Sequence, residues 1–211
     1  MAGYDAVLFD FDGVLIDTEP LHFACWMEVL KAFRIQVTLD QYRRRWVGVS
    51  DRDMLDDFGP LANPPVDGAT LAKFHPAKKQ LFRERSLEAP PWAPGLAGFL
   101  SSLDGYKLAV VTSSGRSEVA PLLEAGGIRH FFGAEVYGNE TPKLKPAPDP
   151  YLRAAELLGV RRPLVVEDSD AGIQSAQAAG FDYVRVGSTA EVREAVGRAI
   201  AAAGAQGEGY R

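Results

Sequence analysis

The chain has 211 residues, of which 46% are hydrophobic and 24% charged, and its formal net charge is −5. This composition is ordinary for a globular enzyme of one or two domains, and the negative charge argues against a nucleic-acid partner. Cys25 is the single cysteine, which excludes an intrachain disulfide, and no stretch is apolar and long enough to span a membrane. The N-terminus lacks the pattern of a signal peptide, so we expect a cytoplasmic protein without a membrane partner.

The first predicted element is a buried strand that ends in two carboxylates. Residues 6–9 form an unbroken apolar run, and Asp10-Phe11-Asp12-Gly13 follows directly. Such runs are typical of strands inside a parallel sheet, which binds ligands beyond the carboxyl ends of its strands. Two close carboxylates repel each other unless a cation compensates, and hard oxygen ligands suit Mg²⁺. The sequence therefore predicts a magnesium site at the end of this strand.

A long helical segment follows the first strand. Asp17-Thr18-Glu19-Pro20 has the composition of a helix start, and residues 21–33 carry one apolar stripe at helical spacing. The pattern stays helical and polar up to residue 88, and residues 89–95 contain three prolines that break helices. We therefore expect a small helical domain of residues 18–88, inserted into a core domain of residues 1–17 and 89–211.

The second half of the chain alternates between strands and helices. Strands are predicted at 107–111, 134–137, 163–166 and 183–186, and helices at 95–103, 117–125, 149–159, 171–179 and 191–203. This order predicts an α/β core with a Rossmann-like, doubly wound parallel sheet. Three of the five strands end in polar residues, at 10–12, 112–114 and 167–168, which such a sheet brings to one crevice.

Four motifs occur in the order of a known family. They are DFDGVL from Asp10, VVTSS up to Ser114, KPAPDPY from Lys145, and VVEDSDAGIQSAQAAG around Asp168. Together they resemble the haloacid dehalogenase superfamily of phosphohydrolases with a helical cap, in particular its β-phosphoglucomutase and phosphoglycolate phosphatase branch. The resemblance implies a Mg²⁺-dependent phosphatase that hydrolyses a small phosphorylated metabolite, such as a sugar phosphate, through an aspartyl-phosphate intermediate.

The resemblance also implies roles for individual residues. Asp10 is the expected nucleophile, and Asp12 is the expected general acid and base, which the halide-displacing members of the superfamily typically lack. Lys145 would stabilise the transferring phosphoryl group, and we prefer it to Lys143 because it directly precedes the Pro-Ala-Pro-Asp run.

The remaining core candidates bind phosphate or metal. Hydroxyl groups after the second strand would hold the phosphoryl oxygens, with Thr112 as the main candidate and Ser113 and Ser114 as secondary ones. The expected metal contacts are Asp10, Asp12 through its backbone carbonyl, and Asp168. Glu167 is either a further ligand or a neighbour bridged by water.

The cap offers weaker candidates for substrate binding. His22 matches a histidine of the β-phosphoglucomutases that assists the second aspartate, but a histidine near Trp26 could equally be a packed core residue. Residues 48–53 resemble the cap loop of these enzymes, yet Asp51 stands where they place an arginine for the second phosphate, and Arg52 is displaced by one residue. We therefore expect a phosphatase first, a phosphomutase as the alternative, and a non-enzymatic phospho-acceptor module as a third interpretation.

Two further lysines of the cap, Lys78 and Lys79, could replace the missing arginine, although solvated surface lysines are the ordinary interpretation. We expect the protein to be a monomer or a weak homo-oligomer.

Overall fold

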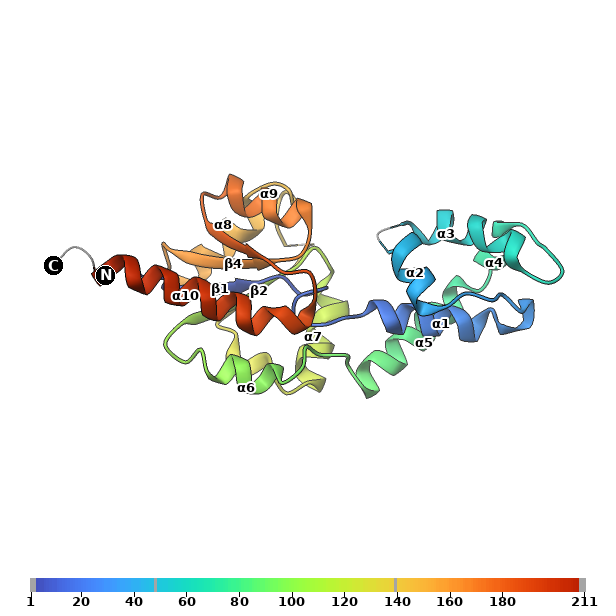
Figure 1. The fold of residues 1–211 in the computed structure, drawn as a ribbon, viewed down its shortest axis with the longest axis horizontal. Helices are drawn as coiled ribbons and strands as arrows, with labels where there is room; N and C mark the ends of the chain where they lie inside the picture. The colour runs from blue at the N-terminus through green and yellow to red at the C-terminus, as the bar shows by residue number, and fades with distance from the viewer. Residues whose placement is uncertain (1–2, 48, 139, 209–211) are drawn as a thin grey trace. The chain divides into compact units, whose positions relative to one another are not determined.

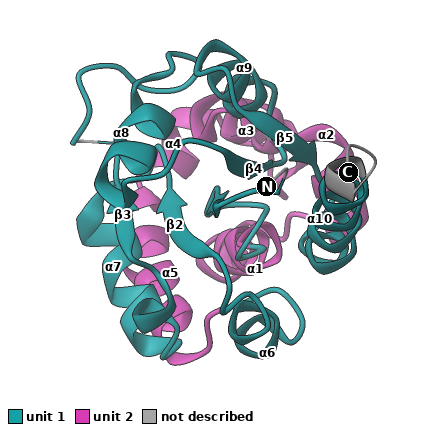
Figure 2. Cartoon of the chain, turned by 90° about the vertical axis from the view of Figure 1, so that its left-hand side faces the viewer, with its two compact units in different colours: residues 1–17, 92–211 teal, residues 18–91 magenta. Residues whose placement is uncertain are grey.

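The computed structural model describes residues 3–47, 49–138 and 140–208, and its ribbon is shown in Figure 1. The chain forms two compact units, coloured separately in Figure 2. The core unit contains Met1–Asp17 and Trp92–Arg211, and the cap unit contains Thr18–Pro91. The cap unit is thus a single insertion between the first and second strands of the core unit.

The core unit is built on a five-stranded parallel sheet with the strand order β3-β2-β1-β4-β5. The strands are β1 (Ala6–Phe9), β2 (Lys107–Val111), β3 (Ala134–Val136), β4 (Pro163–Glu167) and β5 (Asp182–Arg185). All five lie within a residue of the predicted positions. The predicted α/β fold class is confirmed, with the first strand of the chain at the centre of the sheet.

Helices cover both faces of this sheet. They are α6 (Leu96–Ser101), α7 (Arg116–Ala125), η3 (Arg129–Phe131), α8 (Asp149–Leu158), α9 (Asp170–Ala178), η4 (Thr189–Glu191) and α10 (Val192–Glu208). Figure 2 shows α8 and α9 on one side of the sheet and α6, α7 and α10 on the other. Among the described residues, no helix combines the length and the apolar composition that crossing a membrane requires.

The core of this unit follows from the alternation of side chains along the strands. Leu8, Val111 and Val165 point to one face, where they pack with Tyr151 and Ala154 of α8. On the opposite face, the rings of Phe9 and Phe99 meet edge to face with their centroids 6.1 Å apart. Because both faces are covered, β1 is apolar throughout, and β2 and β4 are apolar except at Lys107 and Glu167. These three central strands were therefore easy to predict.

The three central strands stay in register up to the predicted site residues. Phe9 of β1 is aligned with Val110 of β2 and with Val166 of β4. The pairing continues one residue further, since the Asp10 amide donates to the Val166 carbonyl at 3.0 Å. The residues that follow these strands are therefore held at one edge of the sheet by backbone hydrogen bonds.

The cap unit is entirely helical in its described part. Its elements are α1 (Glu19–Val29), η1 (Lys31–Phe33), α2 (Leu39–Arg45), α3 (Asp51–Phe58), η2 (Gly59–Leu61), α4 (Gly68–Ala72) and α5 (His75–Glu88). They surround a core that includes Trp26, Trp46 and Phe58. The predicted helix over residues 21–33 ends early, because α1 stops at Val29 and a short 3₁₀ turn leads to Arg34, whose φ is 54°.

Candidate active site

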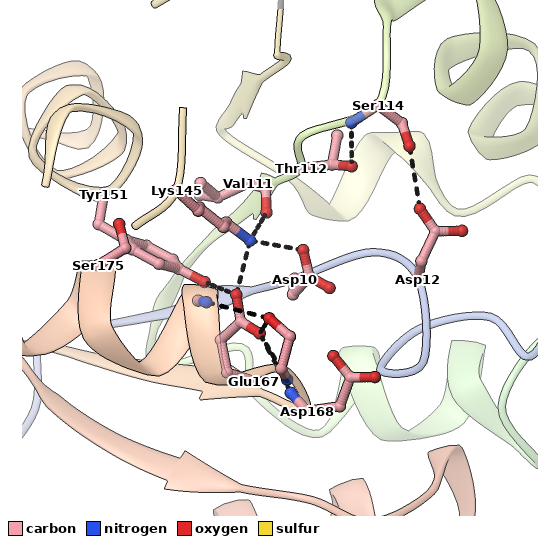
Figure 3. A network of polar contacts seen from close by, with 12 residues as sticks. Asp10, Asp12, Val111, Thr112, Ser114, Lys145, Tyr151, Glu167, Asp168 and Ser175 are labelled. Carbon is pink, nitrogen blue, oxygen red and sulfur yellow. Dashed lines mark hydrogen bonds and ion pairs between the residues drawn. The ribbon is translucent and has the colours of Figure 1, made fainter. Parts of the chain in front are cut away.

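Lys145 is the centre of the polar network at the carboxyl edge of the sheet (Figure 3). Its ammonium nitrogen lies 2.6 Å from Oδ1 of Asp10, 2.6 Å from Oε1 of Glu167 and 2.9 Å from the carbonyl oxygen of Val111. The three hydrogens of the ammonium group therefore have one acceptor each. The competing candidate, Lys143, is exposed. The structure thus joins the loop before α8 to the ends of β1, β2 and β4 through one side chain.

Burial and charge act against each other in this network. The Lys145 side chain is only 5% exposed, and the loss of solvation alone would lower its pKa. The carboxylates of Asp10 and Glu167 outweigh that effect and raise the pKa of Lys145, so its ammonium stays charged. Burial, reinforced by the Glu167 carboxylate, raises the pKa of Asp10 to about 7 despite the opposing charge of Lys145.

Glu167 is fully buried, and its two oxygens are held by five hydrogen bonds. Oε1 accepts from Lys145 and from the Tyr151 phenol at 2.7 Å. Oε2 accepts from the amides of Asp168 and Ser169, at 3.2 Å each, and from the Ser169 hydroxyl at 3.0 Å. Burial, together with the Glu167 carboxylate, raises the pKa of Tyr151 well above its usual value, so the phenol remains a donor.

Three carboxylates lie close enough to share one cation. Asp10, Glu167 and Asp168 each offer an oxygen, and these three oxygens lie within 4.8 Å of one another. Partial burial and the adjacent Glu167 raise the pKa of Asp168. Gly13, with φ 75°, leaves room for Asp168, since a Cβ there would lie 2.1 Å from its Oδ2.

The donor set fits a hard divalent cation. Three carboxylates and the ammonium of Lys145 leave a net charge of −2 when all are ionised. The side chains of Asp10, Glu167 and Lys145 are largely buried, whereas Asp168 is exposed. A Mg²⁺ ion would cancel that charge, and oxygen atoms are the ligands it prefers.

The hydroxyl residues after β2 do not act alike. Thr112 is buried, and its Oγ1 accepts from the Ser114 amide at 2.9 Å, which stabilises the turn. The Ser114 hydroxyl donates to Oδ2 of Asp12 at 3.1 Å, and Ser113 is exposed. Ser114, predicted as a phosphate-binding residue, therefore contacts the expected general acid in this structure.

Comparisons with known proteins show the family of the chain. A family model described as haloacid dehalogenase-like hydrolase matches residues 7–186. The chain belongs to this family. It is 33% identical over 187 residues to the phosphorylated carbohydrates phosphatase of Thermotoga maritima, an alignment that covers 85% of this chain and 83% of that protein. It is 33% identical over 186 residues to the fructose-1-phosphate phosphatase YqaB of Escherichia coli, with 87% of this chain and 96% of that protein covered.

A comparison with solved structures is consistent with this family assignment. A Thermotoga maritima protein provisionally described as a β-phosphoglucomutase has a TM-score of 0.70 and 27% sequence identity. That match covers 92% of this chain and 99% of the other. The predicted family and the predicted enzyme class, a hydrolase with phosphatase relatives, are therefore confirmed.

The cap unit of this family member contains a second polar cluster, centred on a buried lysine. Nζ of Lys78 lies 2.7 Å from Nδ1 of His22 and 3.9 Å from Oδ2 of Asp51, and the same Asp51 oxygen lies 2.9 Å from Nε2 of His75. Because the Lys78 ammonium donates, Nδ1 of His22 is the acceptor and the His22 ring is neutral. Burial, followed by the Lys78 charge, lowers the pKa of His22 to about 4.

Sequence reasoning misplaced or missed three of these residues. Of the two interpretations of Lys78, a substitute for the missing arginine or a solvated surface lysine, the second is wrong, because Lys78 is 4% exposed. The signal was available, since Lys78 stands between Phe74 and Phe82 at helical spacing and therefore on their apolar stripe. Tyr151 and His75 received no role, because a tyrosine inside a motif and a histidine in a helix have many structural uses.

The other cap candidates find less support. Arg52 is exposed on α3, and Lys79 is exposed on α5. Gly48, the first residue of the predicted cap loop, lies outside the described residues. Asp51 opens α3 behind Ser50, whose hydroxyl caps the helix by accepting from the Asp53 amide at 3.2 Å.

Protonation of His22 should couple the stability of the protein to pH. Its pKa is about 4 in the folded chain, against an ordinary value near 6.5, so between these values the unfolded state binds the proton first. The free energy of unfolding should fall by about 2 kcal/mol between pH 7.5 and pH 5 on account of this group. His22→Asn, which keeps an acceptor for Lys78, should lose that part of the pH dependence in urea unfolding. An identical pH dependence in both proteins would contradict the assignment.

Proposed function

We propose that this chain is a Mg²⁺-dependent phosphatase that hydrolyses a small phosphorylated metabolite, of the sugar-phosphate type, through an aspartyl-phosphate intermediate. The observation that carries the proposal is the contact of Lys145 with Asp10 beside the carboxylates of Glu167 and Asp168. The names of the relatives support the substrate class, since they include a phosphatase of phosphorylated carbohydrates and one of fructose 1-phosphate.

Asp10 supplies the nucleophile in the first step. Lys145 occupies its Oδ1, so Oδ2 is the oxygen that attacks phosphorus. As the new O–P bond forms, the P–O bond to the leaving group breaks, and Asp12 donates its proton to the departing oxygen. The Ser114 hydroxyl donates to Oδ2 of Asp12 and so helps to hold this carboxyl group in place.

The second step returns the enzyme to its starting state. The Asp12 carboxylate takes a proton from a water molecule, whose oxygen attacks the phosphorus of the aspartyl phosphate. The bond between Asp10 and phosphorus breaks, inorganic phosphate leaves, and Asp12 is again protonated. Lys145 balances the negative charge at Asp10 in both steps.

Asp10, Asp168 and the backbone carbonyl of Asp12 would hold the Mg²⁺ ion, which neutralises charge on the phosphoryl oxygens when bound. Glu167 fits better as a supporting residue than as a ligand. A carboxylate has about four lone-pair positions, and the protein already fills both Glu167 oxygens with five hydrogen bonds.

We also propose that the insertion between β1 and β2 is the cap domain of the family. Its polar side chains, among them His22 and Arg52, remain candidates for contacts with the substrate.

Asp10→Asn should abolish phosphate release from sugar phosphates, because a carboxamide is not a nucleophile at phosphorus. We expect a fall in kcat of roughly 1,000-fold or more, measured as inorganic phosphate over many turnovers in the presence of Mg²⁺. Asp56→Asn is a matched control, since Asp56 is an exposed residue of the cap unit. Near-normal kcat in Asp10→Asn would remove Asp10 from its role, and a wild-type protein that stops after one turnover would favour the phospho-acceptor module.

Removal of Mg²⁺ should abolish turnover and lower thermal stability. The ion relieves the repulsion among Asp10, Glu167 and Asp168, and saturation at 100 times its dissociation constant adds about 2.7 kcal/mol to the free energy of unfolding. We expect the melting temperature to rise with added Mg²⁺ and to fall back with EDTA. The rise should shrink in Asp168→Asn, whereas full activity in EDTA would refute the metal requirement.

A phosphomutase is the second candidate, favoured by the likeness to the provisionally described β-phosphoglucomutase. The carboxylate of Asp51, in the place of the arginine expected for a second phosphate, disfavours it because a bisphosphate needs a cation there. With β-glucose 1-phosphate and a bisphosphate primer, we expect inorganic phosphate without glucose 6-phosphate. Formation of glucose 6-phosphate faster than phosphate release would establish the mutase instead.

A further inference from the structure

Tyr151 lies under the catalytic network without touching any reacting group. It belongs to the first turns of α8, is fully buried, and donates its phenolic hydrogen to Oε1 of Glu167 at 2.7 Å. Lys145 donates to that same oxygen at 2.6 Å and sits 5.0 Å from the centroid of the Tyr151 ring. One carboxylate oxygen therefore connects the phenol to the ammonium group that contacts Asp10, as Figure 3 shows.

The carboxylate of Glu167 is confined from the other side as well. A Cβ at position 172 of α9 would lie 1.7 Å from Oε1 of Glu167, so the glycine there provides the space that the carboxylate fills. The Ser175 hydroxyl of α9 donates to the carbonyl of Ala147 at 2.6 Å and holds the loop that carries Lys145. Glu167 thus has a single arrangement in which Oε1 meets both donors.

The phenol matters because Oε1 would otherwise have Lys145 as its sole donor. A lone pair left without a donor in a buried site is costly. The contact between Oε1 and the ammonium is already 2.6 Å and cannot shorten, so the carboxylate would turn and the ammonium would move with it. That movement would take Lys145 away from Oδ1 of Asp10. With the phenol in place, Oε1 is satisfied while the ammonium keeps its position between the two carboxylates.

We propose that Tyr151 is a positioning residue for catalysis, which acts by fixing Oε1 of Glu167 so that Lys145 stays aligned with Asp10. The inference rests on the proposed phosphatase function and adds a residue to it. Tyr151 also packs in the apolar core of the unit, and its ring alone would satisfy that role. The hydroxyl is therefore the part of the side chain to test.

Tyr151→Phe should lower kcat about tenfold and leave KM within about twofold, because one hydrogen bond to a charged group is lost and the substrate-binding groups stay intact. Tyr137→Phe is the matched control. Tyr137 directly follows strand β3 and is as fully buried as Tyr151. Its phenol also donates to a carboxylate, that of Glu135, at 2.6 Å. The control should keep the wild-type kcat, and both melting temperatures should be recorded.

A second measurement separates positioning from loss of fold. Orthovanadate imitates the transferring phosphoryl group, and Tyr151→Phe should raise its inhibition constant by about the same factor as it lowers kcat. The Lys145→Met variant lacks the ammonium group. In this background, Tyr151→Phe should have no additional effect on the affinity for vanadate, measured by isothermal titration calorimetry.

The proposal would be overturned by an unchanged kcat in Tyr151→Phe or by an equal fall in kcat for Tyr137→Phe. It would also be overturned if Tyr151→Phe weakened vanadate binding to the full extent in the Lys145→Met background. A Tyr151→Phe protein that unfolds under assay conditions would assign the phenol to stability and overturn the proposal too. A different result is expected if the proposed phosphatase function itself is wrong. In that case the wild-type protein releases no phosphate from any phosphate ester, and the positioning role falls with it.

Discussion

The contact between the Lys145 ammonium and the buried carboxylates is the interaction on which the site depends. It joins residues that are far apart in the chain, since Asp10 precedes the cap unit and Glu167 lies beyond α8. An ammonium group with 5% exposure is stable only if acceptors replace its water, and here all three of its hydrogens have one. The positive charge of Lys145, which holds Asp10 and Glu167 together, is also the charge that the proposed phosphoryl transfer needs.

The surplus of negative charge explains why this site suits a divalent cation. One ammonium cannot balance three carboxylates, and the pKa of Asp10 is raised mainly by burial and further by the Glu167 carboxylate. A raised pKa works against a nucleophile, which must be ionised to attack. A cation held by Asp10 and Asp168 would lower that pKa and favour the ionised form. In the proposed mechanism, metal binding and activation of Asp10 as the nucleophile would therefore meet the same electrostatic requirement.

The parts that could be predicted are those in which local sequence and global fold agree. Residues 6–9, 108–111 and 163–166 are apolar and buried, so they belong to central strands, and parallel strands bring Asp10, Thr112 and Glu167 to one edge. The direction of individual side chains could not be predicted. Ser114 contacts Asp12 because of the turn after β2, a detail that depends on backbone angles rather than on residue type.

The burial of polar side chains was the second feature that could not be predicted from the sequence, and Lys78 shows why. A lysine is assigned to the surface because an ammonium in an apolar setting is costly, unless partners replace its water. Those partners, His22 on α1 and Asp51 on α3, come from other helices and are visible only once the cap unit is folded. Burial lowers the pKa of both His22 and Lys78, and the Asp51 carboxylate opposes this shift in each. A neutral histidine at this place follows from the packing of three helices, not from the residue itself.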